Sequence, residues 1–197
     1  MSWTFFREFI KNCQHTGAVA PSSPQLARLM MKAAGVSQAR NVLELGPGTG
    51  AFTEEIQKAL PVGSRYLGLE MNAAFVDTLK SRFPGMNFEQ AAAQEFDYSP
   101  YLVDGGFDTI VSGLPWAALS ERVQAELLES IYRVLKPDGV FATFVYTGIH
   151  WGPRGQKFRR LLTSRSRKVE TTPTVWTNLP PAFIYVAQPG EAGTRLG

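Results

Sequence analysis

Three absences limit what this chain can be. Cys13 is the only cysteine among 197 residues, which excludes a disulfide-built scaffold. No run of 18 or more apolar residues occurs, which argues against a bilayer-spanning helix, and the charged residues within the first ten are not typical of a signal peptide. With 44% hydrophobic and 19% charged residues, the composition is not that of a disordered chain. We therefore expect one domain with a sizeable core in a reducing cytoplasm.

The excess of positive charge is small but unevenly placed. The whole chain has 20 Lys and Arg against 17 Asp and Glu, whereas residues 151–170 contain seven basic side chains and one acid, Glu170. Such clustering predicts an anionic partner, namely phosphate, nucleic acid or a membrane surface, and the alternative is a solvated helix face. The seven basic residues are Arg154, Lys157, Arg159, Arg160, Arg165, Arg167 and Lys168.

The first 13 residues have a strongly aromatic face. At helical spacing, one face gathers apolar side chains and the other gathers Thr4, Glu8 and two cations. This pattern predicts an interfacial helix whose aromatics dip below lipid headgroups while its cations reach phosphates. A helix that caps the core would show the same pattern. The proposed membrane residues are Trp3, Phe5, Phe6, Arg7, Phe9 and Lys11.

Strands and helices alternate through the middle of the chain. Apolar runs predict strands over 41–45, 65–69, 86–90, 107–111 and 140–146, and helical spacing predicts helices over 52–60, 73–83 and 120–135. Residues 171–176 and 182–187 are expected to form a final antiparallel pair. Alternating βαβ units predict an α/β, Rossmann-like fold, a mainly parallel sheet with helices on both faces. Ligands of such sheets bind at the carboxyl ends of the strands.

The first predicted strand leads directly into three glycines, Gly46, Gly48 and Gly50. Glycines at such a turn permit positive φ and let a ligand approach the backbone closely. Their spacing is Gly-x-Gly-x-Gly, unlike the dinucleotide pattern Gly-x-Gly-x-x-Gly. Glu44 lies two residues before them, where a carboxylate disfavours a pyrophosphate and favours a cationic ligand, directly or through water.

A second acid, Glu70, ends the next predicted strand. A carboxylate at this point can accept hydrogen bonds from both hydroxyls of a ribose. Met71 follows it and is placed to pack against an adenine ring. Two acids on either side of a strand–glycine–helix turn therefore predict a site for a positively charged nucleoside such as S-adenosylmethionine.

The sequence resembles the class I S-adenosylmethionine-dependent methyltransferases over about residues 15–187. Three segments together resemble the small bacterial phospholipid N-methyltransferases, namely His15-Thr-Gly-Ala-Val-Ala-Pro-Ser-Ser23, Leu43-Glu-Leu-Gly-Pro-Gly-Thr-Gly50 and Ser112-Gly-Leu-Pro-Trp116. The resemblance implies a seven-stranded sheet with one antiparallel strand. It also implies S-adenosylmethionine as methyl donor, with S-adenosylhomocysteine as product, and a segment around His15 and Gly17 that folds over the cofactor.

The chain departs from this family after the third strand. Related enzymes often have Asp or Asn there to hold the adenine amine, whereas this chain has Gln90-Ala-Ala-Ala-Gln94 with Ala92 at that place. Adenine recognition is then expected from backbone groups near Ala92 and Ala93, or from Gln94.

The segment 112–116 resembles the acceptor loop of amine and adenine N-methyltransferases. The resemblance implies that the Leu114 carbonyl accepts a hydrogen bond from the target amine, that Trp116 covers it, and that Ser112 lies beside the sulfonium. Pro115 fixes φ and helps to hold the loop. Ser112 replaces the usual Asn, which disfavours a nucleobase because the paired donor and acceptor of an amide are lost.

Methyl transfer to an amine requires a neutral nitrogen, although an ethanolamine ammonium titrates near ~10. A base, a hydrogen-bond acceptor or desolvation must therefore assist. His15 is the first candidate for base or headgroup anchor, with a surface histidine as the alternative. Tyr146 ends a predicted strand and, with Trp116, is a candidate for cation–π contact with the methylated product, unless it belongs to the core.

These observations predict an enzyme that methylates phosphatidylethanolamine and its mono- and dimethyl forms to phosphatidylcholine. It would be cytoplasmic and peripheral on the inner membrane face, with an anionic lipid surface as partner, without metal and without nucleic acid. We expect a membrane-binding helix over 1–14, a methyltransferase domain over 15–189 and a disordered tail over 190–197. The alternatives are an rRNA adenine N6-dimethyltransferase and a cofactor-binding membrane module without catalysis.

Overall fold

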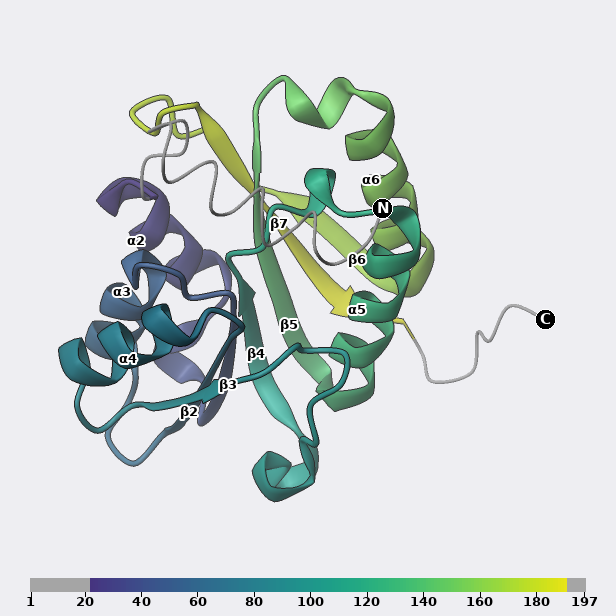
Figure 1. Ribbon diagram of the computed structural model, residues 1–197. Coiled ribbons are helices and arrows are strands. Elements are labelled where there is room, and N and C mark those ends of the chain that lie inside the picture. Colours follow the sequence, from purple (N-terminus) through teal and green to yellow (C-terminus); the bar gives the residue numbers. More distant parts are fainter. Residues whose placement is uncertain (1–21, 191–197) are drawn as a thin grey trace.

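The computed structural model describes residues 22–190 (Figure 1). A central seven-stranded sheet has the order β3-β2-β1-β4-β5-β7-β6. Strands β1 to β5 run parallel to one another, and β7 is antiparallel to both β5 and β6. The strands are β1 (Asn41–Leu45), β2 (Arg65–Glu70), β3 (Asn87–Gln90), β4 (Phe107–Ser112), β5 (Leu135–Tyr146), β6 (Ser166–Thr171) and β7 (Ala182–Pro189).

Helices cover both faces of the sheet and divide the core in two. One cluster of buried side chains lies under α2 (Pro24–Ala33), α3 (Ala51–Ala59) and α4 (Ala73–Arg82), and the other lies under α5 (Glu121–Val134) and α6 (Pro153–Arg165). Figure 1 shows these two groups of helices on opposite sides of the strands. The short helices are η1 (Val36–Gln38), η2 (Ser99–Tyr101), η3 (Val103–Gly105), η4 (Trp116–Ala118) and η5 (Ile149–Trp151).

Strand β1 is the centre of the arrangement. All five of its residues are buried, and it pairs in parallel with β2 on one side and β4 on the other. The chain winds outward from β1 in both directions, so the strand order reverses there, which is where open α/β sheets bind ligands. Leu45 lies opposite Leu69 and Ser112, so the segments that follow β1, β2 and β4 meet at one edge of the sheet. We call this side the carboxyl edge.

The α/β, Rossmann-like fold expected from the alternating pattern is confirmed, but the expected final pair was partly wrong. The partner of β7 is β6 (Ser166–Thr171), which shares only Thr171 with the expected segment 171–176; within that segment, Val175 forms one further bridge, to Ala182. β6 lies at the sheet edge and exposes Arg167, Lys168 and Glu170, so it lacks the apolar alternation that signals a strand. Pro173 offers no backbone N–H with which to extend the pairing.

At the amino ends of the strands, Asp108 ties three segments together. Its carboxylate accepts hydrogen bonds from the backbone N–H groups of Arg40 and Asn41, each at 2.8 Å, and from Lys136 Nζ at 2.7 Å. The Asn41 side chain is itself buried and donates to the carbonyls of Tyr101 and Gly106. This network fixes how β1 begins against β4.

Replacing Asp108 by Ala should lower the free energy of unfolding by roughly 2 kcal/mol, because two backbone N–H groups lose their acceptor. Urea denaturation monitored by circular dichroism measures this loss. Asp77→Ala on the exposed side of α4 is the matched control and should change stability by less than about 0.5 kcal/mol. Equal midpoints for the two variants would contradict the assignment.

Candidate active site

The loop after β1 has the backbone that its glycines predict. Gly46, Gly48 and Gly50 all adopt positive φ, at 68°, 58° and 87°. Gly46 N–H donates to the Leu69 carbonyl at 2.9 Å, which fixes the start of the loop to the end of β2. A Cβ on Gly50 would lie 2.7 Å from the ring of Phe83, so packing also requires glycine there. The result is a bare main-chain turn that leads into α3.

The loop after β4 lies directly against this glycine turn. Gly113 N–H donates to the Leu45 carbonyl at 2.8 Å. A Cβ on Gly113 would come within 2.6 Å of the Gly46 carbonyl oxygen, and a Cβ on Gly46 would come within 2.6 Å of the Leu114 side chain. The two segments that the sequence assigned to cofactor and acceptor are therefore in contact.

Glu70 joins the end of β2 to the glycine turn. One carboxylate oxygen accepts from Gly48 N–H at 3.0 Å, and the other accepts from Met71 N–H at 2.8 Å and Asn72 N–H at 2.9 Å. Burial raises the pKa of Glu70, and these backbone donors oppose that rise. The carboxylate is thus held at the carboxyl edge, beside the backbone turn, as the sequence predicted.

Glu44 lies near the end of β1, two residues before the glycine turn, and its side chain is enclosed by the fold. Its side chain has 0% exposure and lies on the α3 face of the sheet. Oε2 accepts from Thr53 Oγ1 at 2.8 Å and from Tyr66 Oη at 2.5 Å, while Oε1 has no partner. Burial raises the pKa of Glu44 to about 7. The fold therefore uses Oε2 internally and encloses the side chain, and the predicted contact of Glu44 with a cationic ligand, directly or through water, stays a prediction.

Trp116 and Ser112 act differently from expectation. The Trp116 ring is 1% exposed, stacks on Phe158 with ring centroids 4.7 Å apart and meets Phe141 edge-on. Its Nε1–H donates to Ser112 Oγ at 3.1 Å, and that oxygen also accepts from Leu114 N–H at 3.3 Å. The ring therefore anchors the acceptor loop in the core under α6 instead of covering an amine. The Ser112 hydroxyl and the Trp116 indole N–H are therefore both engaged in hydrogen bonds within the protein.

Tyr146 and Trp116 do not share a cavity. Tyr146 packs against the cluster under α2 and α3, with its ring 5.2 Å from that of Phe144, whereas Trp116 belongs to the cluster under α5 and α6. Trp116 contacts Phe141, and because Phe141 and Tyr146 lie five positions apart in β5 they point to opposite faces of the sheet. The rings of Trp116 and Tyr146 therefore cannot both contact one methylated ammonium group.

The turn after β3 holds an unpaired oxygen. The Ala93 carbonyl accepts from both Tyr98 Oη at 2.8 Å and Ser130 Oγ at 3.0 Å, and the Ala92 carbonyl accepts from Glu95 N–H. By contrast, Gln94 Oε1 is buried without a hydrogen-bond partner. Ala91 N–H donates to the Glu70 carbonyl, which places this turn beside the end of β2.

Buried polar atoms without partners gather around the carboxyl edge. Among the side-chain oxygen and nitrogen atoms of residues 22–190 there are three: Glu44 Oε1, Gln94 Oε1 and Thr147 Oγ1. They lie near the end of β1, after β3 and after β5 respectively. An unpaired buried polar atom costs about 1–3 kcal/mol, so such atoms are rare and typical of functional sites.

The basic segment forms α6 and the start of β6. Arg154, Lys157 and Arg160 are exposed, and Lys157 pairs with Glu121. Among the described residues, Arg154 and Arg160 have no carboxylate partner within salt-bridge distance. The predicted contacts of His15, Gly17 and the aromatic face of residues 1–14 lie outside the described residues, as does the tail over 191–197.

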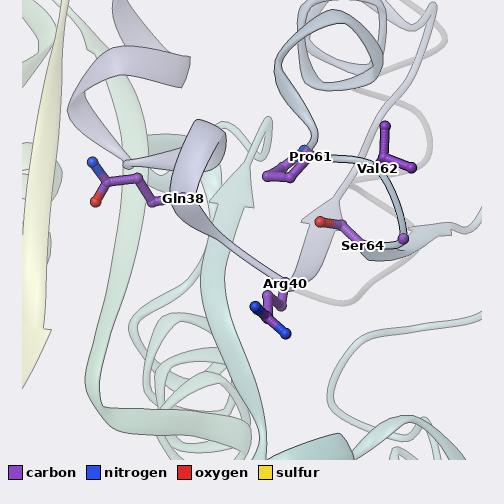
Figure 2. A pocket seen from close by; sticks show the side chains of 6 residues that line it. Gln38, Arg40, Pro61, Val62 and Ser64 are labelled. Atoms are coloured by element: carbon purple, nitrogen blue, oxygen red, sulfur yellow. The ribbon is translucent and has the colours of Figure 1, made fainter.

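Figure 2 shows a surface hollow of about 300 Å³ elsewhere in the molecule. Its residues directly precede β1 and β2, so it lies at the edge opposite the glycine turn and does not contribute to the candidate site. Between residues 22 and 190, no group of three or more His, Cys, Asp or Glu side chains is placed to hold a metal ion. The hollow is lined by Gln38, Arg40, Pro61, Val62, Gly63 and Ser64.

Comparison with known proteins decides the family. Residues 42–139 match a family model described as a methyltransferase domain. An ornithine lipid N-methyltransferase from Singulisphaera acidiphila is 33% identical over 185 residues, which is 92% of each chain. The chain belongs to the S-adenosylmethionine-dependent methyltransferases. The cofactor inferred from the sequence is thereby confirmed.

Solved structures support the fold of this methyltransferase. A TehB-like methyltransferase from Corynebacterium glutamicum aligns with a TM-score of 0.62 and 19% identity, over 96% of this chain and 100% of that one. The N-methyltransferase NodS from Bradyrhizobium japonicum, in complex with S-adenosylhomocysteine, aligns with a TM-score of 0.64 and 16% identity over 85% of each chain. At these identities the likeness concerns the fold alone.

The residues of the methyltransferase fit its cofactor. The positive-φ glycines leave bare backbone at the carboxyl edge, Glu70 holds a carboxylate beside them, and Gln94 holds an acceptor that the fold leaves unpaired. When bound, S-adenosylmethionine supplies an electrophilic methyl group on a positively charged sulfur. Sequence analysis did not identify Thr147 or the two partners of Glu44, Thr53 and Tyr66. Their hydroxyl groups are buried by contacts with distant parts of the chain, and no local sequence pattern indicates such burial.

The pKa of Glu44 predicts a pH-dependent stability. Because the folded value of about 7 exceeds the ordinary 4.5, the unfolded chain releases this proton first as pH rises. Glu44 therefore lowers stability progressively between about pH 4.5 and pH 7, by about 3 kcal/mol in total, and the loss levels off above that range. We expect Glu44→Gln to remove this component.

Urea denaturation at pH 5 and pH 8 tests this expectation. The difference in unfolding free energy, Glu44→Gln minus wild type, should increase by roughly 2–3 kcal/mol between the two pH values, because part of the total loss already occurs below pH 5. Glu95→Gln, at an exposed carboxylate, is the control and should show a constant difference. Parallel pH dependence of wild type and Glu44→Gln would show that Glu44 is charged throughout.

Proposed function

We propose that this methyltransferase transfers methyl groups to the amine of a membrane lipid headgroup, and that phosphatidylethanolamine is a substrate. The observation that carries the proposal is the 33% identity, over 92% of both chains, to a protein named as an ornithine lipid N-methyltransferase. An ornithine lipid and phosphatidylethanolamine have in common an amine carried by a lipid. Successive transfers to phosphatidylethanolamine would give phosphatidylcholine.

For the cofactor, we propose that Glu70 accepts from the ribose hydroxyls and that Gln94 binds the adenine. The backbone carbonyls near Gln94 already have partners, whereas its Oε1 does not. An amide offers an acceptor for the exocyclic adenine amine and a donor for a neighbouring ring nitrogen. Gln94 thus replaces the acidic or amide residue that related enzymes place two positions earlier, at Ala92.

On the acceptor side, the lipid amine must reach the edge as a neutral group. The Leu114 carbonyl accepts from Trp116 N–H at 3.0 Å and has a second lone pair for the amine. Thr147 Oγ1, buried and unpaired after β5, is a second acceptor at this edge. We keep His15 as the proposed base. Apart from proton removal, the contribution of the protein is positioning, since displacement at a sulfonium carbon needs alignment above all.

A lipid substrate requires contact with a membrane surface. No helix within residues 22–190 has the length and apolar character needed to cross a bilayer. We propose that residues 1–14 and the exposed cations of α6 attach the protein to anionic lipid. Nucleic acid as substrate is disfavoured because the Ser112 hydroxyl, which replaces an amide in the acceptor loop, accepts two internal hydrogen bonds.

The role of Gln94 can be tested by comparing two ligands that differ in one group. The purine-riboside analogue of S-adenosylhomocysteine has a hydrogen in place of the exocyclic amine and keeps the neighbouring ring nitrogen as an acceptor. Gln94→Leu should weaken binding of the adenosyl ligand by roughly tenfold and binding of the purine analogue by clearly less, as measured by calorimetry. Glu70→Gln is the control and should weaken both ligands alike. Equal losses for both ligands in Gln94→Leu would rule out an amine contact.

The substrate is tested by offering several acceptors together. With radiolabelled S-adenosylmethionine and mixed vesicles of phosphatidylethanolamine, ornithine lipid and phosphatidylglycerol, plus rRNA, label should appear in the lipids that have an amine and not in phosphatidylglycerol. Chromatography then separates mono-, di- and trimethylated products. Label in ornithine lipid alone would refute phosphatidylethanolamine as substrate, and label in rRNA alone would refute the lipid proposal.

A further inference from the structure

The exposed large apolar side chains of this protein are concentrated at one end. Six are exposed within residues 22–190, and four of them belong to the loops at the carboxyl edge: Ile149, Trp151, Trp176 and Leu179. Both exposed tryptophans of the described chain are in this group, at 69% and 71% exposure. Val62 and Leu102, the other two, precede β2 and β4 at the opposite edge.

The register of the sheet places the β6–β7 loop (residues 172–181) at the same edge as the active site. Leu45 lies beside Ser112, Ser112 beside Thr143, and Thr143 beside Tyr185. From that level β5 continues to Tyr146, whose partner is Ala182, the first residue of β7. The β6–β7 loop and η5 therefore both lie beyond the carboxyl end of β5, and Figure 1 shows the segment after β5 and the β6–β7 loop at the same end of the sheet.

The β6–β7 loop is held firmly at its base. Asn178 is buried, and its Oδ1 accepts from Ser23 N–H at 2.8 Å, at the start of α2. Its Nδ2–H donates to the Pro180 carbonyl at 2.6 Å, and Val175 bridges to Ala182. Trp176 lies between Val175 and Asn178, Leu179 (72% exposed) lies between Asn178 and Pro180, and both side chains project into solvent. A single exposed apolar residue is common on protein surfaces. Two exposed apolar residues on one fixed loop, at the same edge as two more in η5, are unusual.

Positive charge flanks the second loop. Ile149 and Trp151 belong to η5, and His150 packs edge-on against Phe183 at 4.9 Å, which fixes η5 over the start of β7. Arg154, in the first turn of α6, is exposed and has no carboxylate partner among the described residues. Tryptophan beside arginine at an exposed rim is the combination that suits the interface of an anionic bilayer.

We propose that Trp176 and Leu179 of the β6–β7 loop, together with Ile149 and Trp151, insert into the surface of an anionic bilayer and hold the carboxyl edge against it. This inference rests on the proposed lipid substrate and deepens it. It assigns a membrane-docking role to a loop that the sequence did not single out. Docking at this edge presents the acceptor loop to headgroups, so the amine reaches the site without leaving the membrane.

Vesicle partitioning of the full chain, without any methyl donor, tests the proposal. The probe is a vesicle of phosphatidylethanolamine and phosphatidylglycerol. The double variant Trp176→Ala/Leu179→Ala should bind it at least roughly tenfold more weakly than wild type, since two apolar side chains lose their burial. Val62→Ala/Leu102→Ala, the matched pair at the opposite edge, should bind like wild type. Indistinguishable partitioning of the two double variants would overturn the proposal.

Fluorescence gives a second measurement that does not depend on removing side chains from the loop. In a Trp3→Phe/Trp151→Phe background, the remaining tryptophans are Trp176 and the core residue Trp116. Vesicles with brominated acyl chains should quench the exposed component. Absence of quenching would overturn insertion of Trp176. A blue shift that follows protein concentration without vesicles would identify a second copy of the chain as occupant, and would also overturn it.

These outcomes separate the docking surface from the proposed function. One outcome is methyl transfer to an amine lipid in detergent micelles together with vesicle binding that is unchanged in Trp176→Ala/Leu179→Ala. This outcome would refute the docking surface and leave the proposed function intact. Binding that depends on Trp176 and Leu179, without transfer to any amine lipid, would refute the function and support the docking surface.

Discussion

The close approach of two backbone segments at the carboxyl edge is the constraint on which the site depends. Gly113 donates to the Leu45 carbonyl, and neither Gly113 nor Gly46 has room for a side chain. Because the main chains touch, the glycine turn after β1 and the loop after β4, for which we propose cofactor and acceptor roles, have one fixed relation. Methyl transfer in line with a departing sulfur needs such alignment more than it needs acid–base groups.

Buried oxygen atoms without hydrogen-bond partners lower the stability of the fold around this contact. Glu44, Gln94 and Thr147 each hold a buried oxygen without a partner, and all three surround the carboxyl edge. Glu44 differs from the others because Thr53 and Tyr66 occupy its second oxygen and packing excludes solvent. Glu44 thereby links β1 to α3 and β2, whereas no side chain of the described residues occupies Gln94 Oε1. The hydrogen bonds and burial of Glu44 therefore distinguish a carboxylate that serves the fold from an amide, that of Gln94, whose oxygen has no internal partner.

The side chains around the carboxyl edge likewise fall into two groups, one exposed to solvent and one buried in the core. Apolar and basic side chains that elsewhere would be buried or paired project from η5, α6 and the β6–β7 loop. Trp116, in contrast, is drawn into the core by Phe158 and by the Ser112 hydroxyl.

The sequence by itself determined the parallel sheet, the glycine turn and the position of Glu70, because strand periodicity and positive-φ glycines are local properties. It did not determine which side of the sheet Glu44, Trp116 and Tyr146 would face relative to a ligand, nor that Ser166–Thr171 would pair with β7. Those outcomes depend on partners far away in the chain, such as Tyr66 and Phe158, whose positions only tertiary packing fixes. Burial and strand register are long-range quantities, and they decided which predicted residues line the site and which support it.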